Sequence, residues 1–147
     1  MPASIRQAAL TDVPAIVAVE QAAPSAAHWT ADQYKTRVQE GHVIVAEREG
    51  KICGFLCARA VAGEWEIENV VVDQRFRRTG VGSALMRVLL KKWKDSAGTV
   101  VLLEVREGNG VAQSFYEKSG FCQVGRRRAY YRDPVEDGLL YTLRGEP

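Results

Sequence analysis

The stretch NVVVDQRFRRTGVGSAL, residues 69–85, decides the fold, because an apolar strand runs into a basic loop, two glycines and a helix. The first N–H groups of a helix have no partners within the helix, and the helix dipole gives that end positive character. Gly80 and Gly82 lack a Cβ, so a pyrophosphate can approach the main chain closely. Arg77 and Arg78 add charge at the rim. The stretch predicts a site for a phosphorylated ligand.

Two common phosphate-binding motifs do not match this sequence. A Walker loop needs Gly-Lys-Ser/Thr, whereas Gly82 is followed directly by Ser83. The dinucleotide fingerprint needs a third Gly or Ala at the position that Leu85 occupies. The remaining pattern is R-x-x-G-x-G, from Arg77 to Gly82, after a strand that ends near Val72. The alternative is an ordinary helix entry with a solvated basic flank.

The length and composition indicate one soluble domain that spans residues 1–147. A net charge of +2 is too small to favour nucleic-acid binding over the whole surface. No apolar run approaches the roughly 18 residues of a membrane span, and the N-terminus lacks the apolar core of a signal peptide. We therefore expect a cytoplasmic protein without membrane contact, as a monomer or weak dimer.

The three cysteines lie in apolar, strand-like surroundings, so we expect small buried side chains in a reducing compartment. In a regular strand Cys53 and Cys57 would share a face about 13 Å apart, beyond disulfide reach. Cys122 completes the set, and three cysteines without clustered histidines form no zinc pattern. No metal is expected.

Hydrophobic periodicity predicts an α+β domain. Thr11 or Asp12 is expected to cap the first helix, Thr30 and Gln33 to form a capping box, and Asn109 to cap the last helix, which stops at Gly120. The expected strands cover about 4–8, 42–49, 52–61, 64–72, 99–105, 121–131 and 138–143, and the helices follow residue 12 and cover about 30–39, 80–94 and 110–118.

Glu104 is a candidate general base, because strand alternation places it on one face with Val100 and Leu102. A carboxylate that ends an apolar row is costly to bury, and its pKa rises on burial. The alternative is a strand-end glutamate in solvent or paired with an arginine such as Arg106. Tyr116, seven residues after Asn109, can stand beside the strand end, where a protonated phenol can donate to a leaving group. It can equally be a core tyrosine with a satisfied hydroxyl.

The R-x-x-G-x-G loop resembles the coenzyme A pyrophosphate loop of the GCN5-related N-acetyltransferases (GNAT). The block LEVREGNGVAQSFYEKSGF, residues 103–121, resembles the RimI type, the ribosomal-protein-alanine N-acetyltransferases. The resemblance spans essentially the whole chain. It departs from the family's usual spelling at His28, Gly108 and Ala129. It implies a mixed, mostly antiparallel sheet of six to seven strands, with helices on both faces and a splay between the fourth and fifth strands, where acetyl-CoA lies.

The resemblance also implies roles for residues. Glu104 would be the general base, acting directly or through water, and Tyr116 the general acid. The coenzyme would contact Val70, Val71, Val72, Arg77, Arg78, Thr79, Gly80, Val81, Gly82, Ser83, Asn109 and Tyr116. The acceptor would contact Trp29, Glu68, Asn69, Tyr130 and Tyr131. The implied reaction transfers acetyl from acetyl-CoA to a protein's N-terminal α-amine, possibly that of a ribosomal protein, in a ternary complex.

Three other functions stay open. The acceptor can be a small amine or a lysine, the chain can be a coenzyme A-binding module without activity, or Arg126, Arg127 and Arg128 can serve a ribosome- or RNA-binding module. Those arginines can also simply protect a strand edge from pairing. Asp133, Glu136 and Asp137 can recognise a positive acceptor or solvate a turn.

Overall fold

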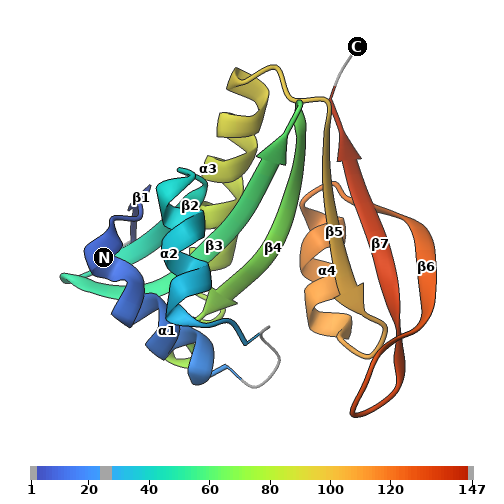
Figure 1. Ribbon diagram of the computed structural model, residues 1–147, viewed down its shortest axis with the longest axis horizontal. Helices are drawn as coiled ribbons and strands as arrows, with labels where there is room; N and C mark the ends of the chain where they lie inside the picture. The colour runs from blue at the N-terminus through green and yellow to red at the C-terminus, as the bar shows by residue number, and fades with distance from the viewer. Residues whose placement is uncertain (1–2, 24–27, 146–147) are drawn as a thin grey trace.

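The computed structural model describes residues 3–23 and 28–145, which form a seven-stranded sheet in the order β1-β2-β3-β4-β5-β7-β6 (Figure 1). The strands are β1 (Ser4–Gln7), β2 (Val43–Arg48), β3 (Lys51–Val61), β4 (Glu64–Val72), β5 (Val100–Arg106), β6 (Cys122–Tyr131) and β7 (Glu136–Arg144). Neighbours are antiparallel except for the parallel pair β4–β5. The predicted α+β class and mixed sheet are confirmed.

Helices cover both faces of the sheet (Figure 1). They are α1 (Val13–Gln21), α2 (Ala31–Gln39), α3 (Val81–Asp95) and α4 (Gly110–Lys118), with short 3₁₀ turns η1 (Leu10–Asp12) and η2 (Gln74–Phe76). One buried cluster joins α1 and α2 to the sheet through Ile16, Tyr34 and Phe55. The other joins α3 and the β5–β7 half through Leu85 and Leu103, and α4 packs against it through Phe115. The sheet therefore separates two cores.

The helix caps agree with the sequence in two cases and differ in one. Thr30 Oγ1 accepts from Gln33 N and Gln33 Oε1 accepts from Thr30 N, which is the predicted capping box. Asn109 Oδ1 accepts from Ala112 N at 3.1 Å, also as predicted. Asp12, one of the two residues expected to cap α1, is its N-cap residue, but the Asp12 side chain makes no capping hydrogen bond. Asp12 has helical backbone angles, and its carboxylate instead accepts from Ala9 N and binds Arg6.

Two β-bulges interrupt the alternation that the sequence suggested. Ala46 pairs with Gly54 and Glu47 with Ile52, so Cys53 is an extra residue in β3. Because a bulge reverses the faces that follow, Cys53 joins the α3 core and Cys57 joins the α1–α2 core, and the expectation of a shared face is wrong. Cys122 is exposed, contrary to its expected burial. In β4 the extra residue is Glu68, which lies between the residues that pair with Cys57 and Ala58.

The parallel β4–β5 pair is short. It extends only over Glu64–Glu66 of β4 and Val100–Leu102 of β5. Beyond Glu66 the two strands diverge, and α4 follows the open end of β5 (Figure 1). The divergence leaves main-chain groups of β4 facing away from β3 in the middle of the sheet.

Candidate active site

The open edge of β4 offers backbone donors. Asp73 N donates to Cys53 O of β3 at 2.8 Å. Because successive N–H groups of a strand point to opposite edges, the N–H groups of Val70 and Val72 point away from β3, toward the divergence. Val71 is buried, with its side chain in the α1–α2 core. Val70 and Val72 are thus the β4 residues whose N–H groups can meet an extended ligand.

The next part of the site is the first turn of α3. Gly80 precedes the helix in the left-handed region at φ +84°, and no side chain among the described residues caps the turn. The first bond within the helix runs from Ala84 N to Gly80 O, so the N–H groups of Val81, Gly82 and exposed Ser83 are available to an anion.

The loop before this helix adds charge and fixed geometry. Arg77 and Arg78 are exposed and make no ion pair within residues 3–23 and 28–145. Arg78 has φ +63°, and such alternation of backbone regions forms anion-binding concavities. Thr79 Oγ1 donates to Phe76 O, which fixes the loop internally. These donors fit a diphosphate.

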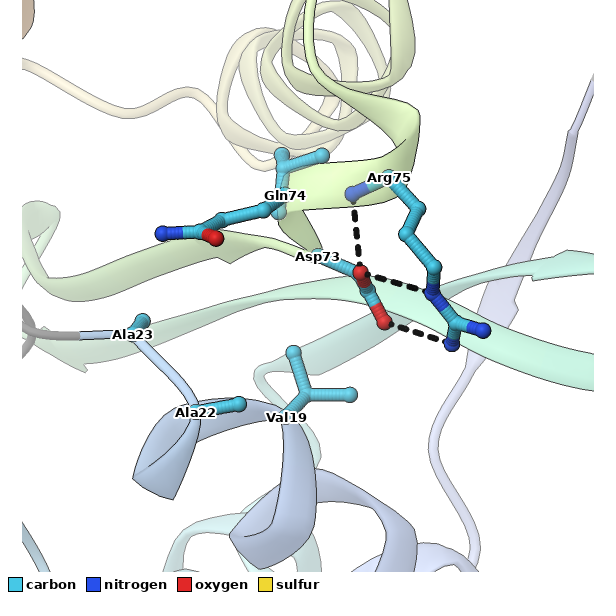
Figure 2. A pocket seen from close by; sticks show the side chains of 7 residues that line it. Val19, Ala22, Ala23, Asp73, Gln74 and Arg75 are labelled. Atoms are coloured by element: carbon cyan, nitrogen blue, oxygen red, sulfur yellow. Dashed lines mark hydrogen bonds and ion pairs between the residues drawn. The ribbon is translucent and has the colours of Figure 1, made fainter.

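A hollow of about 130 Å³ lies between the end of α1 and the end of β4 (Figure 2). Its walls are Val19, Ala22 and Ala23 on one side and Val72–Arg75 on the other. Asp73 accepts from the Arg75 backbone and binds its guanidinium at 3.0 Å. Arg75 is therefore engaged locally, and Arg77 and Arg78 are the loop arginines free to bind phosphate.

Glu104 projects from β5 on the face opposite to the buried Leu103 and Val105. Its Oε1 lies 2.9 Å from Arg127 Nε of β6. The contact has the distance of an ion pair but not the direction of a hydrogen bond, so this buried oxygen accepts none from the described residues. Burial raises the pKa of Glu104, while Arg127 lowers it and Glu66 raises it. The expected alternative partner, Arg106, instead binds Glu136 at 3.1 Å.

Tyr116 lies in α4 among aromatic rings. Its ring centroid is 5.4 Å from Phe115 and 6.0 Å from Phe121. Its hydroxyl makes no hydrogen bond to any residue that the structure describes. Burial, with a smaller contribution from Tyr131, raises its pKa to about 12. The phenol therefore stays protonated at neutral pH with its proton uncommitted.

Tyr131 connects the two candidates electrostatically. Its pKa is raised by burial and next by the negative charge of Glu104, and Tyr131 in turn raises the pKa of Tyr116. The guanidinium carbon of Arg106 lies 4.3 Å from the centre of the Tyr131 ring. The Tyr130 ring packs edge-on against the Tyr131 ring, with 5.1 Å between the ring centres. Glu104, Tyr131 and Tyr116 thus form one electrostatic neighbourhood.

The acidic residues near the C-terminus have structural roles. Asp137 accepts from Ala129 N at 2.8 Å and from Arg126 at 2.7 Å, which holds the irregular part of β6. Glu136 accepts from Gly108 N at 3.0 Å and binds Arg106. These bonds anchor the segment that carries Tyr130 and Tyr131 to the loop before α4.

The remaining acceptor candidates divide into two kinds. Trp29 lies 5.3 Å from Tyr34 and beneath Arg37, and it lines a hollow of about 160 Å³ with Gln33 and Thr36. Glu68 binds Arg37 through both oxygens, at 2.6 and 3.1 Å. Asn69 is buried and donates to Tyr34. Trp29 is thus placed to wall a ligand, whereas Glu68 and Asn69 join β4 to α2.

One buried residue beside this site was missed by the sequence reasoning. Glu20 of α1 is 1% exposed and accepts from Trp29 N, from Tyr34 Oη at 3.1 Å and from His28 at 3.4 Å. Its signal was present, because Glu20 follows Val13 and Ile16 at helical spacing on the apolar face. It fixes the chain that enters α2.

Fold and site together define an acyltransferase. A family model described as the Acetyltransferase (GNAT) family matches residues 7–121. The chain belongs to this family and is an acetyl-CoA-dependent N-acetyltransferase.

Similar proteins include ribosomal-protein-alanine N-acetyltransferases, the RimI type. The [ribosomal protein bS18]-alanine N-acetyltransferase of Escherichia coli K12 is 31% identical over 136 residues, which are 90% of this chain and 91% of that protein. The crystal structure of the ribosomal-protein-S18-alanine N-acetyltransferase from Escherichia coli has a TM-score of 0.88 at 28% identity, over 97% of this chain and 93% of that one. Ard1 from Thermoplasma volcanium reaches 0.91 at 27% identity, over the full length of both.

Two further observations concern the described residues alone. No group of three or more His, Cys, Asp or Glu side chains within them is arranged to hold a metal ion. No helix among them is long and apolar enough to cross a membrane.

Proposed function

We propose that the chain acetylates the N-terminal α-amine of a protein, with an N-terminal alanine of a ribosomal protein as the first candidate. The observation that carries the proposal is the half-buried Glu104 carboxylate at the β4–β5 divergence, which shares Tyr131 as an electrostatic neighbour with the protonated and uncommitted Tyr116. The activity named for the Escherichia coli relative supports this acceptor.

In this proposal, acetyl-CoA binds with its diphosphate on the first turn of α3, where Arg77 and Arg78 add charge. Asn109 and the open edge of β4 contact the rest of the coenzyme. The N–H groups of Val70 and Val72 orient the thioester carbonyl and stabilise the oxyanion. The amine attacks within a ternary complex, with no covalent enzyme intermediate.

Two side chains move the protons. Glu104 accepts a proton from the incoming ammonium, directly or through a water molecule, and Tyr116 donates one to the departing thiolate. An α-amine has a pKa of about 7.7–8.0, against about 10.4 for lysine, so a weaker base suffices for the former. This difference supports an α-amine over a lysine side chain.

The acceptor would lie between the two aromatic groups. Trp29 would wall one side, beside the Arg37–Glu68 pair, and Tyr130 and Tyr131 the other. Glu68 and Asn69 would act from β4 by holding that wall in place.

The test is release of free thiol from acetyl-CoA, with mass spectrometry of the acceptors. The panel contains a peptide with N-terminal alanine and an internal lysine, the same peptide with a blocked N-terminus, and several small amines. We expect acetylation of the free α-amine alone. Reaction of small amines without the peptide would contradict the proposed acceptor, and coenzyme binding without any turnover would indicate a binding module.

A further inference from the structure

A glycine opens a passage across the sheet beside Glu104. Gly138 of β7 pairs with Arg106 on β5 and with Arg127 on β6, so it lies between those two strands. It is buried and has no side chain, and a Cβ there would lie 3.2 Å from Glu104 Cδ. The Arg127 side chain can therefore cross β7 and reach a carboxylate two strands away.

Arg127 differs from its two neighbours in what it contacts. Arg126 binds Asp137 at 2.7 Å and Glu107 at 3.1 Å, and it makes no ion pair with the proposed base among the described residues. Arg128 makes no ion pair within the described ranges. Arg127 has its Nε 2.9 Å from Glu104 Oε1 and its guanidinium carbon 5.2 Å from the centre of the Tyr130 ring.

We propose that Arg127 is a positioning residue for the transfer: it is the counter-ion that keeps Glu104 ionised until the acceptor's ammonium takes its place. The inference rests on the proposed function only where it treats Glu104 as the base. It also assigns a task to one member of the 126–128 arginine cluster.

The charges around Glu104 explain why a counter-ion is needed. Burial and Glu66 of β4 favour the neutral acid, as does any negative charge on Tyr131 of β6. Arg106, on the same strand, is engaged by Glu136. Arg127 is thus the cation available to Glu104. A guanidinium stays protonated, so it cannot act as the base itself.

The same geometry allows the exchange. The Arg127 side chain is 57% exposed, and its contact lacks hydrogen-bond direction. Exposed ion pairs of this kind contribute little free energy, so an ammonium that reaches Glu104 can replace the guanidinium. The displaced guanidinium can then make a cation–π contact with the Tyr130 ring.

The test follows the Glu104 carboxyl directly, without substrate, by ¹³C NMR titration of protein labelled at glutamate Cδ and assigned with Glu104→Gln. We expect Arg127→Gln to raise the titration midpoint by about half a pH unit. Arg127→Lys should bring the titration midpoint most of the way back to the wild-type value. Arg128→Gln, the matched control, should leave the midpoint unchanged. Gly138→Ala, which fills the passage and keeps both charges, should raise it.

An unchanged midpoint in Arg127→Gln would overturn the proposal, and an unchanged midpoint in Gly138→Ala would overturn the role of the passage. Activity is measured separately. If Glu104→Gln acetylates at the wild-type rate while the titrations behave as expected, Glu104 is not the base but Arg127 is still its counter-ion. The two failures are therefore distinguishable.

Discussion

Phe115 of α4 closes onto Gly82 of α3: its Cε1 lies 3.4 Å from the point where a Cβ on residue 82 would stand. The two helices meet at the N-terminal turn proposed to bind the diphosphate. Gly82 therefore has a packing neighbour on one side and a ligand-facing N–H on the other.

This arrangement separates two glycine substitutions. Gly82→Ala should preserve stability, since 3.4 Å is an ordinary contact and alanine favours helices. It should also leave KM for acetyl-CoA unchanged, because the added Cβ points toward Phe115 and away from the ligand-facing N–H. Gly80→Ala has open space around it but φ +84°, so strain of about 1 kcal/mol should lower Tm by about 2–4 °C. Calorimetry and initial rates measure both. A raised KM for acetyl-CoA in Gly82→Ala would contradict the placement of this Cβ against Phe115.

Glu104→Gln keeps the shape of the side chain and removes its basicity. We expect kcat to fall about 10²-fold, the usual contribution of a general base, with coenzyme affinity retained. Glu107→Gln, an exposed carboxylate three residues away that pairs with Arg126, is the matched control and should keep wild-type rates. Equal losses in the two variants would mean a general charge effect.

Two tyrosines should respond in opposite ways to loss of the hydroxyl. Tyr116→Phe should lower kcat about 10²-fold with little change in stability, since this hydroxyl bonds to none of the described residues. Tyr141→Phe loses a bond to Glu117 at 3.0 Å and should cost about 1 kcal/mol of unfolding free energy at unchanged kcat. Urea titration and steady-state kinetics test the pair.

The raised pKa of the Tyr116 phenol predicts how kcat depends on pH. Because its pKa is raised to about 12, it should remain the acid throughout the stable range. A pH profile of kcat should therefore show no alkaline limb below pH of about 10. A limb near the ordinary tyrosine pKa that disappears in Tyr116→Phe would contradict the assigned environment.

The Arg6–Asp12 ion pair should make the free energy of unfolding depend on pH in the acid range. Hydrogen bonds from Arg6 hold the pKa of Asp12 below its usual value, so the pair stabilises the fold at neutral pH and is lost as pH falls through the folded-state pKa. Arg6→Gln should therefore destabilise at pH 7, and the difference from the wild type should vanish once the pH falls below the folded-state pKa of Asp12. Lys91→Gln, which removes an exposed ion pair with Asp95, should change the free energy of unfolding little at either pH.

Elements and caps could be predicted because their signals are local. The bounds of β4, the Thr30–Gln33 box and the Asn109 cap each depend on residues within a few positions of one another. The α3 loop is likewise continuous in sequence, so its glycines and arginines indicated a phosphate site without tertiary information.

Contacts that depend on another strand could not be predicted in this way. The Cys53 bulge depends on register with β2, so alternation within β3 could not place Cys57. Likewise, nothing near Glu104 in the sequence indicates that Arg127, 23 positions later, reaches it across Gly138. The helix sequence alone predicts a capping bond from Asp12, because the bond between Asp12 and Arg6 of β1 cannot be read from it.

The bulge at Glu68 makes β4 a strand in which residue count matters as much as residue identity. Before it, Trp65 and Ile67 face the α3 core; after it, Asn69 and Val71 face the α1–α2 core. Deleting Glu68 would restore strict alternation and leave the residues on either side of it on their present faces. Deleting Glu66 or Ile67 would restore the alternation by turning the charged Glu68 toward the α3 core. We expect this strand to fold after loss of Glu68, apart from the lost ion pair with Arg37, but not after loss of Glu66 or Ile67, so the position of a length change decides its effect.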